Sequence, residues 1–221
     1  MFENIIKNVH NRHPLIHCIT NYVSINDCAN IVLACGGAPI MAEDINEVSQ
    51  ITSICQGLDI NIGMLNDNKL SSMLKAGATA NELGIPVILD PVGAGSSDYR
   101  IKAVQNLMSN VQFGVIRGNV SEIKAIAEKQ GIHNIAAGVY ETMQKNKSAM
   151  GVEAGIADKI TDDNIKEMAD FINKLSQKTG AVIAVTGGID MVADENRVYA
   201  IRNGHKMMTV SYTHLRAHET T

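Results

Sequence analysis

The stretch from Lys69 to Gly95 constrains the fold more than any other part of the chain. Residues 69–83 have helical periodicity, Gly84 stands where a helix terminator belongs, and residues 85–89 form a short apolar run. Asp90-Pro91-Val92-Gly93-Ala94-Gly95 follows at the end of that run. A helix, a buried strand and then a polar, glycine-containing segment is typical of α/β proteins, in which helices cover a mostly parallel sheet.

The same alternation runs along the rest of the chain. Ser24 is expected to begin a helix, with Asp27 in a capping-box arrangement and Gly36-Gly37 at its end. Further expected elements are strands over 38–41, 58–62, 113–116 and 181–185, helices over 120–129 and 161–178, and a hairpin joining 198–201 to 206–209. Residues 138–159 have weak periodicity and are expected to form a loop-rich insertion.

Charge and hydropathy exclude several functional classes. The 221 residues carry a net charge of −4, so no basic surface is expected for a nucleic acid or an anionic membrane. No apolar run approaches the roughly 20 residues that span a bilayer. The first residues, MFENIIKNVHNRHP, lack the segments of a signal peptide. A cytoplasmic protein without nucleic-acid or membrane partners is expected.

The four cysteines are predicted to be small core residues in a reducing compartment. Cys18, Cys28, Cys35 and Cys55 form no CxxC pair and have no matched histidine spacing, which argues against a structural zinc site. Cys28 and Cys35 are seven residues apart in an apolar helical pattern and are expected to share one buried face.

Polar residues near the ends of three predicted strands form the candidate site. Asp90, Arg117 and Thr186 are expected at one rim, because ligands of parallel α/β sheets bind beyond the carboxyl ends of the strands. Glu122 lies three residues after Asn119 and shares its helix face. Two carboxylates suit Mg²⁺, the fork of Arg117 suits phosphate, and Thr186 offers a hydroxyl or an N–H group.

Each of these signals also has an ordinary structural explanation. An Asp-Pro step usually forms a turn, and an acidic residue in the first turn of a helix complements the helix dipole. Gly93-Ala94-Gly95 suggests a Rossmann nucleotide fold, but the third glycine of that fingerprint is missing. The combination of motifs is far more specific than any one of them.

That combination resembles the hydroxyethylthiazole kinase family from near the start of the chain to Thr209. The segments that carry the resemblance are Ile19-Thr20-Asn21, Ala38-Pro39-Ile40-Met41-Ala42, the run from Pro86 to Gly95, the run from Ile116 to Ile123, Val185-Thr186-Gly187 and Asn203-Gly204-His205. The pair of Asp90-Pro91-Val92 with Asn119-x-x-Glu122 is shared with the wider ribokinase-like superfamily.

The resemblance implies a ribokinase-like three-layer sandwich that transfers the γ-phosphoryl group of ATP to the hydroxyl of 4-methyl-5-(2-hydroxyethyl)thiazole, a step of thiamine salvage. Carried over by position, Met41 and Asn21 lie in the thiazole pocket and Arg117 and Thr186 contact ATP. Asp90 and Glu122 organise Mg²⁺ near the phosphates. The family is usually trimeric, with pockets near subunit interfaces, so a homotrimer is expected for the full-length protein.

The chain departs from the family pattern after Thr209. Members of the family continue into a T-G-x-G-C turn, whose backbone N–H groups form an anion hole and whose cysteine stands at the position of the base of related sugar kinases. Here residues 210–221 read VSYTHLRAHETT, which resembles one reading frame of a sequencing adapter. We therefore expect a partial kinase domain over 1–209, a non-native tail over 210–221, no catalytic residue within the chain and no useful kinase activity.

Other readings of the sequence stay open. The chain could be a ribokinase-like kinase of a pyrimidine or pyridoxal-type alcohol, although the contexts of Asn21 and Met41 favour the thiazole. A non-catalytic nucleotide- or thiazole-binding protein is an alternative from another class. His214 and His218, four residues apart in the tail, could form a metal-binding pair, but the likeness to an adapter argues against it.

Overall fold

The computed structural model describes residues 2–132 and 159–203. Within these ranges the helices are α1 (Phe2–Arg12), α2 (Ile25–Ala34), α3 (Val48–Ser53), α4 (Asp67–Glu82), α5 (Asp98–Asn110), α6 (Val120–Lys129) and α8 (Ile165–Thr179). The strands are β1 (Leu15–Ile19), β2 (Ala38–Ile40), β3 (Gly57–Asn61), β4 (Val87–Asp90), β5 (Val115–Asn119), β6 (Val182–Thr186), β7 (Asp190–Ala193) and β8 (Val198–Ile201).

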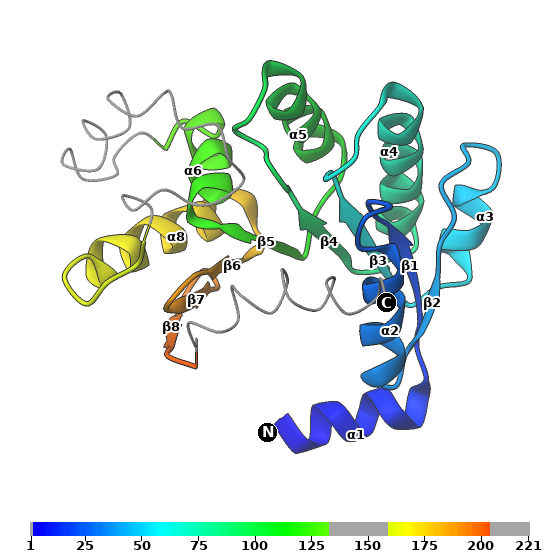
Figure 1. Cartoon of the computed structure of the whole chain (residues 1–221), viewed down its shortest axis with the longest axis horizontal. Helices are drawn as coiled ribbons and strands as arrows, with labels where there is room; N and C mark the ends of the chain where they lie inside the picture. Colours follow the sequence, from blue (N-terminus) through cyan, green and yellow to red (C-terminus); the bar gives the residue numbers. More distant parts are fainter. Residues whose placement is uncertain (1, 133–158, 204–221) are drawn as a thin grey trace, which may run out of the picture.

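These strands form one eight-stranded sheet in the order β2-β1-β3-β4-β5-β6-β7-β8. Neighbours from β2 to β6 are parallel, whereas β7 and β8 are added antiparallel at one edge. Figure 1 shows α4, α5 and α6 along one side of this sheet and α2 on the opposite side. The predicted mostly parallel α/β sheet with helices on both faces is therefore confirmed.

The hydrophobic core lies between the sheet and the helices α4, α5, α6 and α8. Strand β4 shows how the sequence directs this, since its side chains alternate between the two faces of the sheet. Val87 and Leu89 are fully buried in the core, whereas Ile88, on the other face, keeps 41% of its surface exposed in the described part of the chain. The face opposite the core is thus covered over β1 and β3 and more open over β4.

The helix and strand predicted over residues 69–89 are α4 and β4, which occur in the predicted order but with different boundaries. Helix α4 begins two residues earlier than expected because Asn66 caps it, its side chain accepting a 2.9 Å hydrogen bond from the Lys69 N–H. It ends before Gly84, whose φ of +67° lies in the left-handed region that glycine tolerates. Helix α6 has the predicted bounds.

Several local predictions were wrong or incomplete. Ser24 precedes α2 without capping it through its side chain, because its hydroxyl donates to Asn21 Oδ1 instead. Helix α8 begins at Ile165 rather than near Thr161, since Asn164 accepts from the Thr161 N–H within the preceding turn. Helices α1, α3 and α5 and strands β1 and β7 had not been predicted. The predicted insertion over 138–159, except its last residue, the second hairpin strand over 206–209 and the tail over 210–221 lie outside the described residues.

The cysteines differ from the prediction of four core residues. Cys18 and Cys55 are buried, but Cys28 is half-buried and Cys35 is exposed, and all four thiols are free. Helix α2 has no buried residue at all, so the predicted buried face shared by Cys28 and Cys35 does not exist in the isolated chain. The apolar pattern of this helix was read as burial, yet Ile31 and Leu33 are 60% and 57% exposed.

Gly77 marks the closest approach of α4 to the segment before β5. A Cβ atom at this position would lie 2.5 and 2.7 Å from the two methyl groups of Val111. We expect Gly77→Ala to lower the free energy of unfolding by up to about 2 kcal/mol, because overpacking costs about 1–3 kcal/mol and the gain in helix propensity offsets only about 1 kcal/mol. Urea denaturation measures this; Gly188→Ala, where the added methyl meets open space, is the control and should change little.

None of the helices described by the structure is both long and apolar enough to cross a membrane.

Candidate active site

The predicted site residues lie in a row along the carboxyl edge of the parallel strands. Asn21 and Met41 follow β1 and β2, and Asn61, Asp90, Asn119 and Thr186 are the last residues of β3, β4, β5 and β6. The sheet register pairs Asn61 with Asp90 and Asn119 with Thr186. An ion pair joins Asp90 to Arg117 on the neighbouring strand. Asp90, Arg117 and Thr186 therefore lie at one rim, as their positions in the sequence predicted, and Asn61 joins them without having been predicted.

Asp90 is the centre of this row. Its Oδ2 accepts a 3.1 Å hydrogen bond from Asn61 Nδ2 and lies 3.3 Å from Arg117 Nη1. Burial raises the pKa of the Asp90 carboxyl, and the nearby Arg117 guanidinium opposes that rise. The Glu122 carboxylate adds a smaller upward effect on the same pKa, which places the two acidic groups within electrostatic reach of each other.

Glu122 joins two segments at the entrance of the site. Its carboxylate completes a capping box with Asn119, accepting a 2.8 Å hydrogen bond from the Asn119 N–H while the Asn119 side chain accepts from the Glu122 N–H. Its other oxygen accepts a 2.9 Å hydrogen bond from the Gly93 N–H. The side chain is only 7% exposed, so it holds the loop after β4 against the start of α6.

The donor set at this edge fits Mg²⁺. The ion prefers hard oxygen ligands and is usually bound by one or two carboxylates together with water and phosphate oxygens. Asn61 and Arg117 both donate their hydrogen bonds to Oδ2 of Asp90, so Oδ1 has no hydrogen-bond partner among the described residues. Each Glu122 oxygen accepts one N–H and retains a further lone pair, because an ionised carboxylate offers about four acceptor sites.

Arg117 lies on β5, the strand next to Asp90, and Thr186 ends the following strand, β6. The Arg117 side chain is 52% exposed, so its remaining N–H groups are accessible to a ligand. Thr186 donates a weak 3.4 Å hydrogen bond to the Gly118 carbonyl oxygen, which keeps its hydroxyl at the end of β6. A cationic fork and a hydroxyl beside a carboxylate pair can together bind a polyphosphate.

Asn21 and Met41 lie at the other end of the row. The Asn21 side chain accepts from the N–H and the hydroxyl of Ser24 and donates a 3.3 Å hydrogen bond to Asn61 Oδ1. Asn61 in turn donates to Asp90, so one chain of side-chain hydrogen bonds connects the end of β1 to the end of β4. Met41 is half-buried directly after β2, and its neighbour Ala42 is buried.

A family model described as "HK: Hydroxyethylthiazole kinase family" matches residues 6–213. The chain belongs to the hydroxyethylthiazole kinase family. A hydroxyethylthiazole kinase of Clostridium acetobutylicum is 51% identical over 209 residues, which are 95% of this chain and 71% of that protein. One of Desulfovibrio desulfuricans is 45% identical over 94% of this chain and 67% of its own length. The predicted class, an ATP-using kinase, is therefore confirmed.

Solved structures agree with that assignment. A hydroxyethylthiazole kinase from Pyrococcus horikoshii OT3 superposes with a TM-score of 0.76 at 31% identity, covering 94% of this chain and 68% of that one. A phosphomethylpyrimidine kinase from Clostridium difficile 630 has a TM-score of 0.56 at 12% identity, covering 91% of this chain and 90% of that one, and shares the fold alone. The predicted ribokinase-like fold is thus confirmed for this member of the hydroxyethylthiazole kinase family.

Arg117 was expected in the loop after its strand, but it lies inside β5, two residues before the end. Three other residues of this kinase were missed by the sequence analysis. Asn61 connects Asn21 to Asp90, and Arg100 and the buried Lys69 brace the neighbouring loops. Asn61 had a usable signal, because it ends an apolar run as Asp90 does.

Lys69 supports the segment that carries Asn21. Its ammonium group donates to the Thr20 carbonyl, pairs with Glu43 at 2.9 Å and lies 4.5 Å from the centre of the Tyr22 ring. The Tyr22 hydroxyl also donates to Glu43. One buried cation thus ties the segments after β1 and β2 to α4, next to the two residues expected in the substrate pocket.

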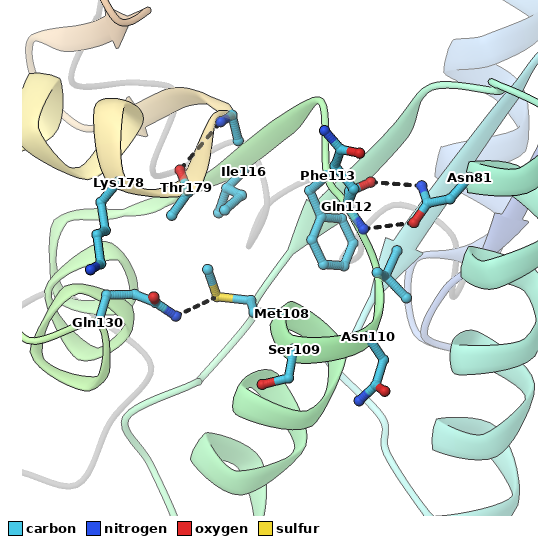
Figure 2. A pocket seen from close by; sticks show the side chains of 12 residues that line it. Asn81, Met108, Ser109, Asn110, Gln112, Phe113, Ile116, Gln130, Lys178 and Thr179 are labelled. Atoms are coloured by element: carbon cyan, nitrogen blue, oxygen red, sulfur yellow. Dashed lines mark hydrogen bonds between the residues drawn. The ribbon is translucent and has the colours of Figure 1, made fainter.

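A cavity of about 480 Å³ opens at the opposite end of the strands. Figure 2 shows its polar lining, in which Gln112 exchanges hydrogen bonds with Asn81 and Gln130 donates to the Met108 sulfur. The lining comes from the ends of α4, α5, α6 and α8, the segments that follow α5 and α8, and Ile116 of β5. None of the predicted site residues belongs to it. Since ligands of parallel sheets bind at the carboxyl edge, we assign no role to this cavity.

Asp59, on the same sheet face as Arg117, gives a pH-dependent prediction. Burial, assisted by Asp90 and opposed by Arg117, raises the pKa of its carboxyl to about 6, and the thiols of Cys18 and Cys28 also face it. Its contribution to stability is full below the ordinary pKa of 3.8 and is lost as the pH rises through about 6.

We therefore expect Asp59→Asn to raise the free energy of unfolding by about 1–3 kcal/mol near pH 7.5 in metal-free buffer, and by about half as much near pH 5. Urea denaturation at both pH values measures the difference. Asp98→Asn, which removes an exposed carboxylate, serves as the control and should show no such pH dependence. A lower stability of Asp59→Asn near pH 7.5 would contradict the prediction.

Proposed function

We propose that this chain carries the ATP and substrate sites of an enzyme that phosphorylates the hydroxyl of 4-methyl-5-(2-hydroxyethyl)thiazole in thiamine salvage. The observation that supports it best is the hydrogen-bonded series from Asn21 through Asn61 to Asp90. It joins the expected thiazole end of the row to the expected phosphate end. Direct transfer needs the substrate hydroxyl and the γ-phosphate to meet in line, and this series fixes the two ends of the row relative to each other.

In this proposal the side chains position the two substrates and neutralise the charge of the phosphates. Asp90 and Glu122 hold Mg²⁺, which supplies charge neutralisation at the phosphate oxygens. Arg117 binds phosphate oxygens through its guanidinium fork, and Thr186 binds through its hydroxyl or N–H. Asn21 and Met41 orient the thiazole, the amide through hydrogen bonding and the thioether through adaptable apolar contact.

The proposal assigns residues 1–209 to the kinase domain and treats 210–221 as foreign to it. The chain spans 71% and 67% of the two curated relatives described above. The cysteine expected of the family's T-G-x-G-C turn does not occur after Cys55 in this chain, so we assign no catalytic residue here. Sequencing the native gene past the codon of Thr209 tests this division, which a natural continuation into VSYTHLRAHETT would overturn.

Two preparations test the function. The chain itself is titrated with ATP in the presence of Mg²⁺ and with the thiazole alcohol by calorimetry; we expect binding of both and no useful phosphorylation. A chimaera that joins residues 1–209 to the C-terminal segment of the Clostridium acetobutylicum relative is then assayed by mass spectrometry for the phosphorylated thiazole. Circular dichroism first confirms that both preparations are folded.

A substrate panel separates the thiazole from the alternatives. The chimaera is expected to phosphorylate the thiazole alcohol in preference to hydroxymethylpyrimidine and pyridoxal. Preference for either competitor would replace the proposed substrate. Failure of the folded chain to bind ATP with Mg²⁺ would reject the proposed nucleotide site itself.

We also propose a homotrimer that forms through the apolar side chains of α1 and α2. Ile5 and Ile6 on α1 and Ile31 and Leu33 on α2 are all more than half exposed, and such apolar surface is typical of an interaction site. Light scattering coupled to size exclusion measures the oligomer. Leu33→Glu should produce a folded monomer if this surface forms the interface.

A cytoplasmic location is proposed from the thiols. Four free cysteines, one of them exposed, suit a reducing compartment in which ATP is also available. Fractionation of cells that express the native gene tests it.

A further inference from the structure

Two cysteines and a carboxylate from three different elements converge beneath α2. Cys18 lies on β1, Asp59 lies opposite it on β3, and Cys28 comes from α2. One sulfur or oxygen atom from each of the three side chains lies within 4.8 Å of the other two. We call these three residues the thiol–carboxylate cluster.

The sheet register and the position of α2 explain why they meet. Cys18 and Asp59 are directly paired neighbours on parallel strands, so their side chains point to the same face of the sheet. Helix α2 lies on that face and brings the Cys28 sulfur 4.0 Å from Asp59 Oδ2. Cys18 is buried, and the other two residues are half-buried. Ten residues separate the cysteines, which is why no metal-binding spacing was visible in the sequence.

We propose that the thiol–carboxylate cluster binds a soft divalent cation of the zinc class, with Cys18, Cys28 and Asp59 as ligands. Tetrahedral Zn²⁺ with Zn–S bonds of about 2.3 Å requires sulfur ligands about 3.8 Å apart. The Cys28 sulfur lies 4.0 Å from Asp59 Oδ2 and no pair in the cluster is more than 4.8 Å apart, so side-chain rotations that shorten these distances by up to about 1 Å bring the three atoms onto one ion. Three protein ligands leave the fourth position for water.

The charges around the cluster favour a cation. Asp59 interacts electrostatically with a second carboxylate, Asp90, and both groups are partly buried, so a positive ion between the thiols and Asp59 relieves the repulsion between the two carboxylates. The cluster differs in chemistry from the pair Asp90 and Glu122, which offers only hard oxygen ligands. Thiolate ligands select zinc-like ions over Mg²⁺, so the two sites take different metals.

Cobalt(II) is the probe, because its bonds to thiolate give a sulfur-to-metal charge-transfer band that carboxylate ligands do not give. The full chain is reduced, freed of metal and titrated with Co²⁺ without oxygen. We expect a saturable charge-transfer band with one equivalent of Co²⁺, unaffected by excess Mg²⁺ and displaced by Zn²⁺. Since thiols must lose protons on binding, the apparent affinity should increase with pH.

Three variants assign the ligands. Cys28→Ser and Asp59→Asn should each weaken Co²⁺ binding by at least about tenfold, and Cys28→Ser should also reduce the intensity of the band. Cys35→Ser, which removes an exposed thiol of the same segment, is the matched control and should bind as the unchanged protein does. Circular dichroism confirms that each variant is folded.

A second measurement needs no variant: bound Zn²⁺ should protect Cys28 from alkylation by iodoacetamide at least about tenfold while Cys35 stays reactive. The proposal is overturned if the folded, reduced protein gives no charge-transfer band. It is also overturned if the band of Cys28→Ser keeps the intensity and affinity of the unchanged protein, if the band disappears in Cys35→Ser, or if zinc leaves the alkylation of Cys28 unchanged. None of these readouts depends on ATP binding or phosphorylation.

Discussion

Replacing Asp90 by asparagine is expected to lower kcat of the chimaeric enzyme by about 10²–10³-fold, the size of effect seen when a group that stabilises transition-state charge is removed. Asparagine keeps the shape of the side chain and can still accept from Asn61, but it has no charge to hold Mg²⁺ beside the phosphates. The ion pair with Arg117 is lost as well. Steady-state kinetics with saturating ATP and Mg²⁺ measure the change.

Two comparisons make this result specific to the site. Asp98→Asn, an equal change of charge in the first turn of α5, should leave kcat unchanged. In the Asp90→Asn variant, calorimetry should show weaker binding of ATP in the presence of Mg²⁺ while binding of the thiazole alcohol persists. A kcat within a few-fold of the unchanged chimaera would remove Asp90 from the proposed metal site.

The second large effect is expected from Arg100→Met. The Arg100 guanidinium donates to three backbone carbonyls, those of Ile62, Gly63 and Val92, at 2.6, 2.8 and 2.9 Å. These carbonyls belong to the segments after β3 and β4, so one side chain fixes two loops of the site. Methionine preserves much of the packing volume but leaves the carbonyls without their donor, which should cost about 2–4 kcal/mol of unfolding free energy.

Urea denaturation of the chain measures that loss. Lys102→Met, on the exposed side of the same helix, is the control for removing a positive charge and should change stability little. Arg100→Lys should give an intermediate result, because one ammonium group cannot reproduce the planar fork. Equal stability of Arg100→Met and Lys102→Met would show that the three hydrogen bonds contribute no net stability.

The parts of the fold that depend on local sequence patterns could be predicted. Helix α6 has its predicted bounds because a capping box and a regular apolar face specify it without help from the rest of the chain. Asp90, Arg117 and Thr186 could be placed at one rim because parallel strands bring their carboxyl ends together. The roles of Met41 and Asn21 came from the resemblance and stay predictions.

Contacts between distant segments could not be predicted in this way. Arg100 lies on a helix whose apolar pattern was too weak to be recognised, and its three partners are backbone groups, which leave no mark in the sequence. The exposure of Cys35 was missed for a different reason: an apolar helix was assumed to be buried within its own chain. Cys28 meets Cys18 and Asp59 only because of how α2 crosses the sheet.

The strand order β2-β1-β3 has one further consequence. From β1 the chain first moves outward to β2, and all later parallel strands are added on the other side of β1. Right-handed crossovers in opposite directions place their helices on opposite faces, as seen for α2 and α4 (Figure 1). The segments leaving β1 and β3 therefore lead to helices on opposite faces, and the hydrogen bond between Asn21 and Asn61 lies where the two segments part. In open α/β sheets this point of reversal, beyond the carboxyl ends of the strands, is where ligands bind.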